Sequence, residues 1–500
     1  MKHFVLTLSF LLVTATMMAE RFTIDELTYE TTSDTTVAIV DADDSVVSVE
    51  ISSSVTHDGT TYSVTEIGRE AFADSHMLEY LDIPSGVTTI ANVAFMDCIQ
   101  LSTINLPSSV DSLGNRVFWG CISLETVTIP RGATKLGEGI FDGCWSLSSV
   151  TIEADLTVIP RSMFEGCEML SSIEIPSTVT RINPQAFMNC SSLTTIDIPD
   201  NVTSIGYSAF EGCSSLASVI IGRGVKQLED YMFDYCYSLT SVVWNARDCD
   251  DFSLLESPFA GIREQITSFT LGDGVEYIPA SLCEQMTSLE SVTIPSGVKR
   301  IGNRAFYECS SLKDITIADS IIEIQEYAFA ATKYYLNPFN WLGGALYIGN
   351  YLIEAPVVVL GKFQVKDGTL LIANSAFTNT LDMTSVTIPS SVTHIGDMAF
   401  YFCSTLQSIE VQALEPPKVG VEAFEAVDRS IPVIVPAQSL EAYRQAEVWK
   451  EFTYLHEEGS PTGIDDNTVI RHSNSRKFIQ NGSIFIQNKG NVYTIQGACL

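Results

Sequence analysis

The sequence has little positive charge and few charged residues of any kind. Lysine and arginine number 27 against 61 aspartate and glutamate residues, so the formal net charge is −34 at pH 7. Nucleic acid carries a dense negative charge that such a chain would repel, which excludes DNA and RNA as partners. Charged residues make up only 18% of the chain and hydrophobic residues 46%. A disordered protein needs the opposite balance, so most of this chain is expected to bury a core.

The motifs of the common enzyme classes are missing as well. The histidines stand far apart, without the spacing of a metal site or a catalytic triad: His3, His57, His76, His394, His456 and His472. The chain has no G-x-S-x-G elbow, no P-loop and no H-E-x-x-H. A glycosidase carboxylate pair is defined by a distance in space and stays open at this stage. We therefore predict a protein that is not an enzyme and has no catalytic residue, metal or cofactor.

Long hydrophobic runs are absent except near the N-terminus. A basic start (M-K-H) precedes an apolar stretch over residues 4–12, and Ala19 stands just before Glu20. This pattern predicts a cleaved secretory signal over residues 1–19. The stretch is shorter than the roughly 20 residues of a membrane span, so no transmembrane segment is expected. The first cysteine after the signal is Cys98, which excludes a lipid anchor on a new N-terminal cysteine. We expect a protein that is secreted or held on the outer-membrane surface.

A framework residue recurs at regular spacing over most of the chain. The first eight positions follow one another every 23 residues, and later steps include one of 26, two of 24 and one of double length. The positions are Phe72, Phe95, Phe118, Phe141, Phe164, Phe187, Phe210, Phe233, Phe259, Leu282, Phe306, Phe329, Phe377, Phe400 and Phe424. A period of this length predicts a solenoid of stacked coils.

Each repeat combines a strand with a return segment. In the copy over residues 190–211, the pattern L-x-x-I-x-I at 193–198 alternates as a strand with one buried face does. Pro199 ends that strand because it offers no N–H to a ladder. The V-x-x-I-G segment at 202–206 turns the chain back, and Ala209-Phe210 fills the interior. One coil cannot bury this face alone, so neighbouring coils are expected to stack as parallel strands about 4.8 Å apart.

The C-x-S-L-x-x-[V/I]-x-I-P start and the V-x-x-I-G-x-x-A-F finish resemble the BspA-like leucine-rich repeat family. The resemblance covers about residues 62–455 and implies a repeat solenoid with coils of about 23 residues. It implies a parallel β-sheet on one face and short turns or 3-10 segments on the other. Two departures stand out: three extra residues with an acidic cluster (Asp248, Asp250, Asp251) before Phe259, and an insertion between Phe329 and Phe377.

The remaining segments are assigned by composition. We predict an N-terminal β cap over 20–61, the solenoid over 62–455 with an insertion at 332–374, and a strand-helix cap at 431–455. A polar linker follows at 456–475, and a short tail at 476–500. The tail resembles the C-terminal tails of proteins exported across the outer membrane of gut and oral anaerobes, some of them type IX sorting signals. That resemblance implies a role in export and surface attachment.

Most of the twelve cysteines occupy one position of the repeat. Nine stand three residues after a framework aromatic: Cys98, Cys121, Cys144, Cys167, Cys190, Cys213, Cys236, Cys309 and Cys403. Side chains in one column of a parallel stack lie about 4.8 Å apart at Cβ, whereas a relaxed disulfide prefers about 3.8 Å. We therefore predict free thiols packed in the core. A few disulfides and metal binding stay open as alternatives.

The outward side chains of the strands form the first candidate binding site. They are mainly short hydroxyl and acidic groups: Tyr80, Asp82, Thr103, Asn105, Thr126, Thr128, Ser149, Thr151, Ser172, Glu174, Thr195 and Asp197. Such a row on a rigid sheet could bind an extended polypeptide or a glycan. Threonine is also favoured at exposed strand positions for its own sake, so the row has a purely structural alternative.

A second candidate site is the aromatic cluster in the insertion. It consists of Tyr334, Tyr335, Phe339, Trp341, Tyr347 and Tyr351. Clustered aromatic residues can anchor a partner, while packing of a hairpin against the solenoid is the alternative. The family resemblance implies adhesion to host or bacterial proteins. Two other functions stay open: a glycan-binding accessory protein and a structural element of a surface layer. The sequence leaves the oligomeric state unknown.

Overall fold

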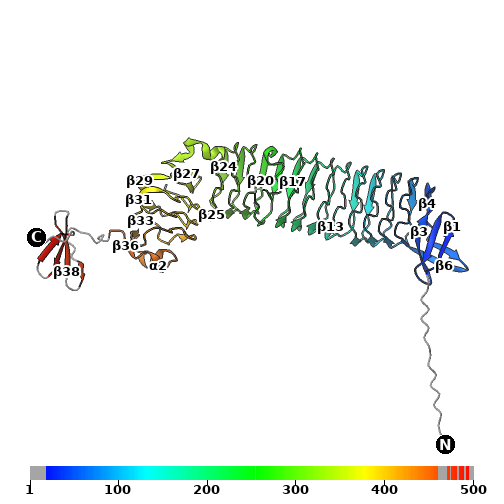
Figure 1. The fold of residues 1–500 in the computed structure, drawn as a ribbon, viewed down its shortest axis with the longest axis horizontal. Helices are drawn as coiled ribbons and strands as arrows, with labels where there is room; N and C mark the ends of the chain where they lie inside the picture. Colours follow the sequence, from blue (N-terminus) through cyan, green and yellow to red (C-terminus); the bar gives the residue numbers. More distant parts are fainter. Residues whose placement is uncertain are drawn as a thin grey trace, which may run out of the picture. The chain divides into compact units, whose positions relative to one another are not determined.

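The repeats of the sequence form the coils of a parallel β-solenoid in the computed structural model (Figure 1). The structure describes residues 19–253, 255–459 and the strands 470–472, 475–480, 483–488 and 491–494. The expected signal sequence thus lies outside the described residues except for Ala19. The chain divides into two compact units. Unit 1 comprises residues 1–295 and 306–312, and unit 2 comprises residues 296–305 and 313–500.

The L-x-x-[V/I]-x-I segments of unit 1 form the strand face. Val127 and Ile129 point into the core, and Thr126 and Thr128 between them point outward. The strands are β4 (Ser48–Glu50), β7 (Tyr80–Asp82), β10 (Thr126–Ile129), β12 (Ser149–Ile152), β15 (Thr195–Asp197), β17 (Ser218–Ile221), β19 (Ser241–Trp244), β20 (Ser268–Leu271) and β22 (Ser291–Ile294). Neighbouring strands pair in parallel and in register, as β17 does with β19. The sequence predicts this pairing correctly, because the buried face of each strand must continue that of the coil before it.

The V-x-x-I-G segments form a second parallel ladder, where the family resemblance implies only turns or 3-10 segments. Two residues of each coil take part, and turns follow them. The strands are β8 (Thr89–Ile90), β9 (Ser112–Leu113), β11 (Lys135–Leu136), β13 (Val158–Ile159), β14 (Arg181–Ile182), β16 (Ser204–Ile205), β18 (Gln227–Leu228) and β21 (Tyr277–Ile278). A 3-10 helix occurs in the described part of unit 1 only at η1 (Arg263–Gln265).

The turn around each framework aromatic also bonds to the next coil. The N–H of Phe95 donates to the carbonyl of Val117, and the N–H of Phe118 donates to Ile140, both at 2.9 Å. A third row of backbone hydrogen bonds therefore runs along the stack beside the two ladders. Such bonding satisfies turn amides that would otherwise be buried without partners.

The framework phenylalanines of unit 1 stack in one buried column. Rings from Phe72 to Phe259 follow one another with centroids 5.2–5.7 Å apart and nearly parallel planes. The next position of the column is Cys283, so our assignment of Leu282 to the series is wrong by one residue. The thiol of Cys309 donates to the carbonyl of Cys283, 26 residues earlier, as the thiol of Cys98 donates to Phe72. Leu282 fits the sequence pattern because it is the apolar residue closest to the expected spacing.

The cysteines line the interior beside this column. The eleven that the structure describes are free and buried, as predicted. Each of the nine repeat-position thiols donates to a backbone carbonyl of the preceding coil, at 3.0–3.3 Å. Burial raises the pKa of the Cys309 thiol to about 12 and that of Cys403 to about 11. These groups are neutral small core residues and not thiolate ligands.

The N-terminal segment forms an antiparallel meander. Its strands are β1 (Arg21–Ile24), β2 (Leu27–Thr31), β3 (Thr36–Ala42), β5 (Ser54–His57) and β6 (Thr60–Ile67). Strands β1, β2 and β3 pair antiparallel, β5 and β6 form a hairpin, and β6 pairs in parallel with both β3 and β8. The second ladder therefore continues from the meander as far as β11, and β13, β14, β16 and β18 form a further sheet. Strand β4 likewise pairs with β7 of the strand face.

Unit 2 repeats the two-ladder arrangement. Its strand face is the sheet of β29 (Val358–Gln364), β31 (Leu381–Ile388), β33 (Ser408–Val411), β35 (Pro432–Val435) and β36 (Tyr454–Glu457), and β24 (Asp314–Ile317) lies outside that sheet. Its second ladder comprises β28 (Tyr351–Glu354), β30 (Leu371–Ile372), β32 (His394–Ile395) and β34 (Lys418–Val419), while β23 (Arg300–Ile301) and β25 (Glu323–Ile324) pair with each other outside it. Strands β26 (Trp341–Leu342) and β27 (Ala345–Ile348) extend this ladder antiparallel from β28. The inserted segment thus supplies β28 to one ladder and β29 to the other.

Short helices lie in the insertion and at the end of the unit 2 coils. They are α1 (Lys333–Leu336), η2 (Pro338–Asn340), α2 (Leu440–Gln445) and η3 (Trp449–Glu451). Tyr443, Trp449 and Phe452 are buried there, and the Trp449 ring lies 5.5 Å from that of Phe424. These side chains cover the apolar interior of the last coils. Farther along, β37 (Ile470–His472), β38 (Ser475–Gln480), β39 (Ser483–Asn488) and β40 (Asn491–Thr494) form an antiparallel sheet within the tail region.

Candidate binding surfaces

The twelve candidate residues of the strand face are all exposed. Parallel pairing aligns them coil by coil: Thr126 lies beside Ser149, and Thr128 lies beside Thr151. Two isolated bridges align Asp82 with Asn105 and Thr103 with Thr126. The structure therefore brings side chains 23 residues apart into adjacent positions, as the period requires. The result is a row of short polar groups on a backbone held by ladder hydrogen bonds.

The ladder of the strand face breaks between β12 and β15, and again after β20. Residues 171–176 are extended between β12 and β15 but do not form a strand, so Ser172 and Glu174 lie outside regular structure. The side chains still alternate, with Ile175 buried and Glu174 exposed. Alternation of apolar residues in sequence reports which side chains face the core, but it does not establish the spacing of backbone hydrogen bonds.

Several turns that lead into the strand face carry an exposed apolar residue, Met77 and Tyr237 among them, and two such residues lie next to each other. Trp145 is 53% exposed and Met169 is 57% exposed, and the N–H of Met169 donates to the carbonyl of Trp145 at 3.0 Å. They therefore lie on adjacent coils, just upstream of Ser149 and Ser172. Sequence reasoning missed them because these two turn positions hold polar residues in most repeats. Departure from that polar pattern is the signal that would have found them.

The aromatic residues of the insertion are mostly used for packing. Tyr347 and Tyr351 are 5% and 0% exposed. The Tyr351 hydroxyl donates to the carbonyl of Ala318 at 2.7 Å, and the Tyr347 hydroxyl accepts from the N–H of Lys366 at 3.1 Å. These two tyrosines therefore follow the packing alternative and do not belong to an exposed patch. Both lie on β-strands with their rings buried, a role that aromatic residues favour wherever their hydroxyl finds a partner.

Tyr334, Tyr335 and Trp341 are half-buried, and their polar atoms are bonded within the insertion. Tyr335 donates to the Glu354 carboxylate, and the Trp341 indole donates to the Tyr335 carbonyl at 2.7 Å. Burial and the Glu354 carboxylate raise the pKa of Tyr335 well above its usual range. Phe339 alone of the six is largely free, with 89% of its surface exposed. The predicted aromatic patch is thus reduced to one ring.

The coil with three extra residues creates a groove beside the second ladder of unit 1. The groove has a volume of about 720 Å³. Its lining combines residues of three regular coils with the extended loop: Arg181, Ser204, Tyr207, Gln227, Leu228, Glu229, Asp230, Asp250, Asp251, Phe252 and Glu256. Asp251 accepts from the N–H of Ala280 at 2.8 Å and from the Tyr277 hydroxyl, which holds the loop against the next coil. The three extra residues reveal the loop in the sequence. They do not reveal which residues of the neighbouring coils line the groove.

Carboxylates in the groove lie close enough to influence one another. Burial raises the pKa of Asp230, and the negative charges of Glu256 and Glu229 raise it further. The rings of Tyr207 and Tyr231 meet edge to face at 5.5 Å beside this acidic region, and both are nearly half exposed. Aromatic faces next to hydrogen-bonding groups in a hollow suit a small polar ligand.

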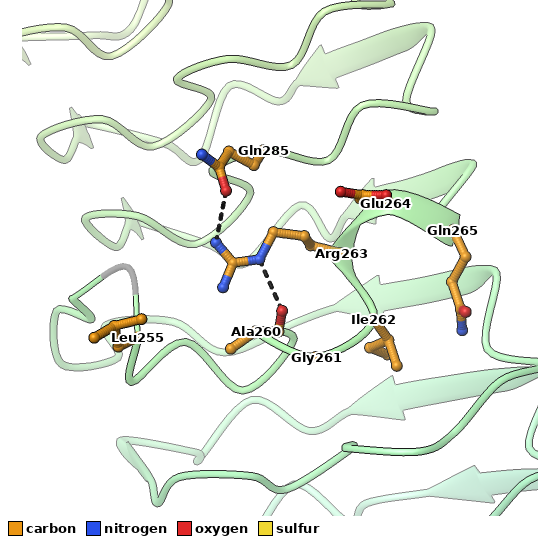
Figure 2. A pocket seen from close by; sticks show the side chains of 8 residues that line it. All are labelled: Leu255, Ala260, Gly261, Ile262, Arg263, Glu264, Gln265 and Gln285. Carbon is orange, nitrogen blue, oxygen red and sulfur yellow. Dashed lines mark hydrogen bonds between the residues drawn. The ribbon is translucent and has the colours of Figure 1, made fainter.

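The same loop borders a second, smaller pocket of about 560 Å³ (Figure 2). Arg263 of η1 spans it: its Nε donates to the carbonyl of Ala260 at 2.9 Å and its Nη1 donates to Gln285 at 3.2 Å. Gln265 points the other way and donates to the carbonyls of Cys236 and Leu239. These hydrogen bonds link η1 to the coils on either side, at the point where the three extra residues interrupt the repeat. The guanidinium is thus engaged in holding two coils together.

The repeats match a known family. The BspA type leucine rich repeat region, defined over six copies, matches residues 52–171, 157–282, 253–355 and 370–446. These stretches make up more than half of the chain. The chain belongs to this family. BspA-type repeats build binding scaffolds, which accords with a surface of aligned side chains on stacked coils.

Several solved structures of bacterial leucine-rich repeat proteins are similar to this chain. One from Bacteroides ovatus is 23% identical, covers 87% of this chain and 99% of its own, and gives a TM-score of 0.41. A leucine rich cell surface protein from Faecalibacterium prausnitzii is 24% identical over 78% of this chain and 94% of its own, with a TM-score of 0.35. The pneumococcal vaccine antigen PcpA is 15% identical over 88% and 99%, with a TM-score of 0.31. No curated protein matches the chain.

The helices of the described residues are short. None of them has the length and hydrophobicity needed to cross a membrane.

Proposed function

We propose that this protein is a secreted or surface-exposed adhesion protein that recognises host or bacterial proteins through the strand face of unit 1. The observation that carries the proposal is the row of exposed polar side chains aligned from Tyr80 to Asp197. Because the backbone beneath this row is held by hydrogen bonds, binding would order little of the protein. A preorganised surface of this kind suits an extended partner.

Trp145 and Met169 supply the apolar contribution that a polar row lacks. Interface energy concentrates in a few aromatic and similarly large residues surrounded by polar contacts. The two side chains lie on adjacent coils, beside the strand face, and both are more than half exposed. They are the residues that we expect to anchor a partner. The polar residues of the strand face would then determine the position of the partner along the stacked coils.

The charge of the protein favours a basic partner. The net charge is −34, and the strand face itself carries Asp82, Glu174 and Asp197. Complementary charge speeds association and makes it sensitive to salt. Export by the N-terminal signal and attachment by the C-terminal tail belong to the same proposal. Both segments have the sequence patterns of those roles.

A second candidate function is glycan binding at the groove of the extended coil. The adjacent carboxylates and the exposed ring of Tyr207 favour it, because carboxylates accept hydrogen bonds from sugar hydroxyls and an aromatic face packs on a sugar ring. The aromatic insertion gives this alternative no further support, since only Phe339 is largely exposed there.

A binding screen tests both candidates. The protein is assayed against extracellular matrix proteins, bacterial surface proteins and a glycan array. For any protein ligand, the double variant Glu174→Lys and Asp197→Lys should weaken binding about tenfold at low salt and flatten its salt dependence, since long-range attraction is screened by salt. Stability should change by less than about 0.5 kcal/mol, because these side chains point into solvent.

The matched control carries the same charge change away from the strand face. Glu138→Lys and Asp273→Lys reverse two exposed acids that lie outside its strands. Equal loss of binding in both double variants would remove the strand face from the proposal and leave only a general charge effect. A glycan ligand whose binding is lost in Tyr207→Ala, but not in the strand-face variant, would establish the second candidate instead.

A further inference from the structure

Three metal-ligating side chains converge in the N-terminal meander although they are distant in sequence. Glu20 precedes β1, His57 ends β5, and Asp58 begins the turn of the β5–β6 hairpin. One potential ligand atom of each lies within 4.8 Å of the others. The histidines show no metal-ligand spacing in sequence, because the partner of the His57-Asp58 pair stands 37 residues earlier. Strands β1 and β5 do not pair, so the contact of Phe22 on β1 with His57 and Tyr62 of the β5–β6 hairpin brings them together.

Packing determines where the His57 ring points. The ring stacks on that of buried Phe22, with centroids 4.1 Å apart and planes 3° from parallel. Its Nε2 lies 3.4 Å from a Glu20 carboxylate oxygen and 3.8 Å from one of Asp58. Both distances exceed the usual N–H···O range of about 2.7–3.2 Å. The imidazole is therefore held facing two carboxylates without closing a normal hydrogen bond to either.

These distances match the edges of a metal coordination shell. Ligand atoms about 2.0–2.1 Å from a tetrahedral Zn²⁺ stand about 3.3–3.4 Å from one another. The His57–Glu20 distance agrees with this value directly, and a small rotation of the exposed Asp58 side chain would bring its oxygen to the same distance. An imidazole combined with carboxylates suits Zn²⁺ and similar transition metals, whereas Ca²⁺ and Mg²⁺ prefer oxygen ligands alone.

We propose that Glu20, His57 and Asp58 form a binding site for a divalent transition metal such as Zn²⁺. His57 contributes Nε2, each carboxylate contributes one oxygen, and water completes the shell. The site is independent of the strand face and of any adhesion partner. Its ligands are half or more exposed except for His57, so the metal exchanges with the surrounding medium.

The metal would tie the first strand to the hairpin. Strand β1 pairs only with β2 in the described sheet, so it is an edge strand. The backbone of Glu20 is already positioned, since its N–H donates to the Thr31 hydroxyl at 2.9 Å and its carbonyl accepts from the N–H of Thr31 at 3.0 Å. A metal that bridges Glu20 to the hairpin turn would hold the start of β1 to the β5–β6 hairpin, in addition to the pairing of β1 with β2. We therefore expect metal binding to stabilise the meander against local opening.

Calorimetric titration of the chelator-treated protein with ZnCl₂ tests the site. We expect one equivalent to bind, with Ca²⁺ and Mg²⁺ unable to compete. His57→Ala should weaken binding at least tenfold, and Glu20→Gln, which keeps the stacked histidine, should weaken it several-fold. His76→Ala is the matched control, because His76 is exposed and its Nδ1 lies 3.0 Å from the Asp97 carbonyl, away from the cluster. It should bind Zn²⁺ as the unmodified protein does.

Cobalt substitution gives an independent readout. Co²⁺ in this site should show the visible absorption of a nitrogen- and oxygen-ligated ion, without the sulfur charge-transfer band that cysteine ligands would produce. Unchanged Zn²⁺ affinity in both His57→Ala and Glu20→Gln would overturn the proposal, as would equal loss in His76→Ala. Absence of stoichiometric binding to the unmodified protein would likewise reduce the cluster to a set of ion pairs.

Discussion

The carboxyl group of Asp142 lies half-buried in the turn after Phe141. Burial raises its pKa to about 6, the Glu165 carboxylate raises it as well, and Arg116 and Trp119 oppose the rise. Glu165 occupies the same position on the next coil, where the repeat places like charges side by side. In the folded protein Asp142 therefore holds its proton to a higher pH than in the unfolded chain, where its pKa is near 3.8.

Asp142→Asn should stabilise the protein at neutral pH. Between about pH 4 and 6 the folded state binds more protons at this site than the unfolded state, so stability falls as pH rises through that window. Above pH 6 the Asp142 carboxylate is charged in the folded protein, and this charge lowers the free energy of unfolding. The neutral amide of asparagine removes that cost. Because solvent screens a half-exposed group, we expect the substitution to raise the free energy of unfolding by only about 1 kcal/mol at pH 7.5. At pH 3.5 we expect no change. Urea unfolding at the two pH values measures it, and an equal gain at both would contradict the electrostatic cause.

At the scale of the element, glycine lets the return segment of some coils approach the preceding coil closely. The residue after the second-ladder isoleucine or leucine is glycine in many repeats. A Cβ at Gly206 would lie 2.6 Å from the backbone nitrogen and Cδ of Pro184 on the preceding coil. At this coil the two backbones approach too closely for a side chain without some movement. Other coils hold Asn183 or Glu229 at the equivalent position, so the requirement at Gly206 comes from local packing and not from backbone conformation.

Gly206→Ala should therefore lower the free energy of unfolding by about 1–3 kcal/mol, because the clash is with backbone that cannot move without separating the coils. Gly274→Ala is the matched control: a methyl group added there would have nothing within 4 Å, and the φ of Gly274 is not left-handed. That variant should change stability by less than about 1 kcal/mol, and can gain from reduced unfolded-state entropy. Equal stability of the two variants in thermal or urea unfolding would show that the coils separate readily.

The extended coil shows how one element can depart from the repeat without breaking the stack. Residues that would continue the regular turn are replaced by η1, and Gln265 bonds two carbonyls of the preceding coil at 2.7 and 2.9 Å. A single side chain thus satisfies backbone groups that the missing turn would have satisfied. The groove and the pocket both adjoin this loop. Hollows form in this repeat protein where the period is interrupted, because regular coils fill their own interior.

At the scale of the molecule, stability comes from neighbouring coils covering one another. In unit 1 the stack of phenylalanine rings and the thiol column run through consecutive coils. A coil has no buried face of its own, so an end without a cap exposes apolar side chains and unpaired strand edges. The meander and the buried aromatic residues Tyr443, Trp449 and Phe452 prevent this at the two natural ends.

A chain divided between Gly212 and Cys213 should give two poorly behaved halves. The cut separates the Phe210 ring from the Phe233 ring on which it stacks. It also separates β15 from β17, so that each of these strands loses a partner. We expect aggregation on gel filtration and increased binding of a hydrophobic dye. Two monomeric fragments with sharp thermal transitions would contradict the view that each coil depends on the next.

Some features of the sites were visible in sequence and others were not. The outward positions of the strand face follow from alternation alone, and all twelve proved exposed. Tyr347 and Tyr351 could not be separated from Phe339 by sequence, because aromatic residues serve packing and binding equally well. The column residue Cys283 was missed because its neighbour Leu282 looks more like a core residue. Trp145, Met169 and the groove around Tyr207 depend on which coils lie side by side.

The sequence by itself determined the period, the stacking of coils, the free thiols and the absence of a membrane-spanning pattern, because each follows from local spacing and hydrophobicity. Tertiary structure alone decided that the return segments form a second ladder and that the insertion contributes strands to both ladders. It also decided that Glu20 meets His57 and Asp58. These features depend on contacts between residues far apart in the chain, and a repeat pattern specifies such contacts only where the repeat is unbroken.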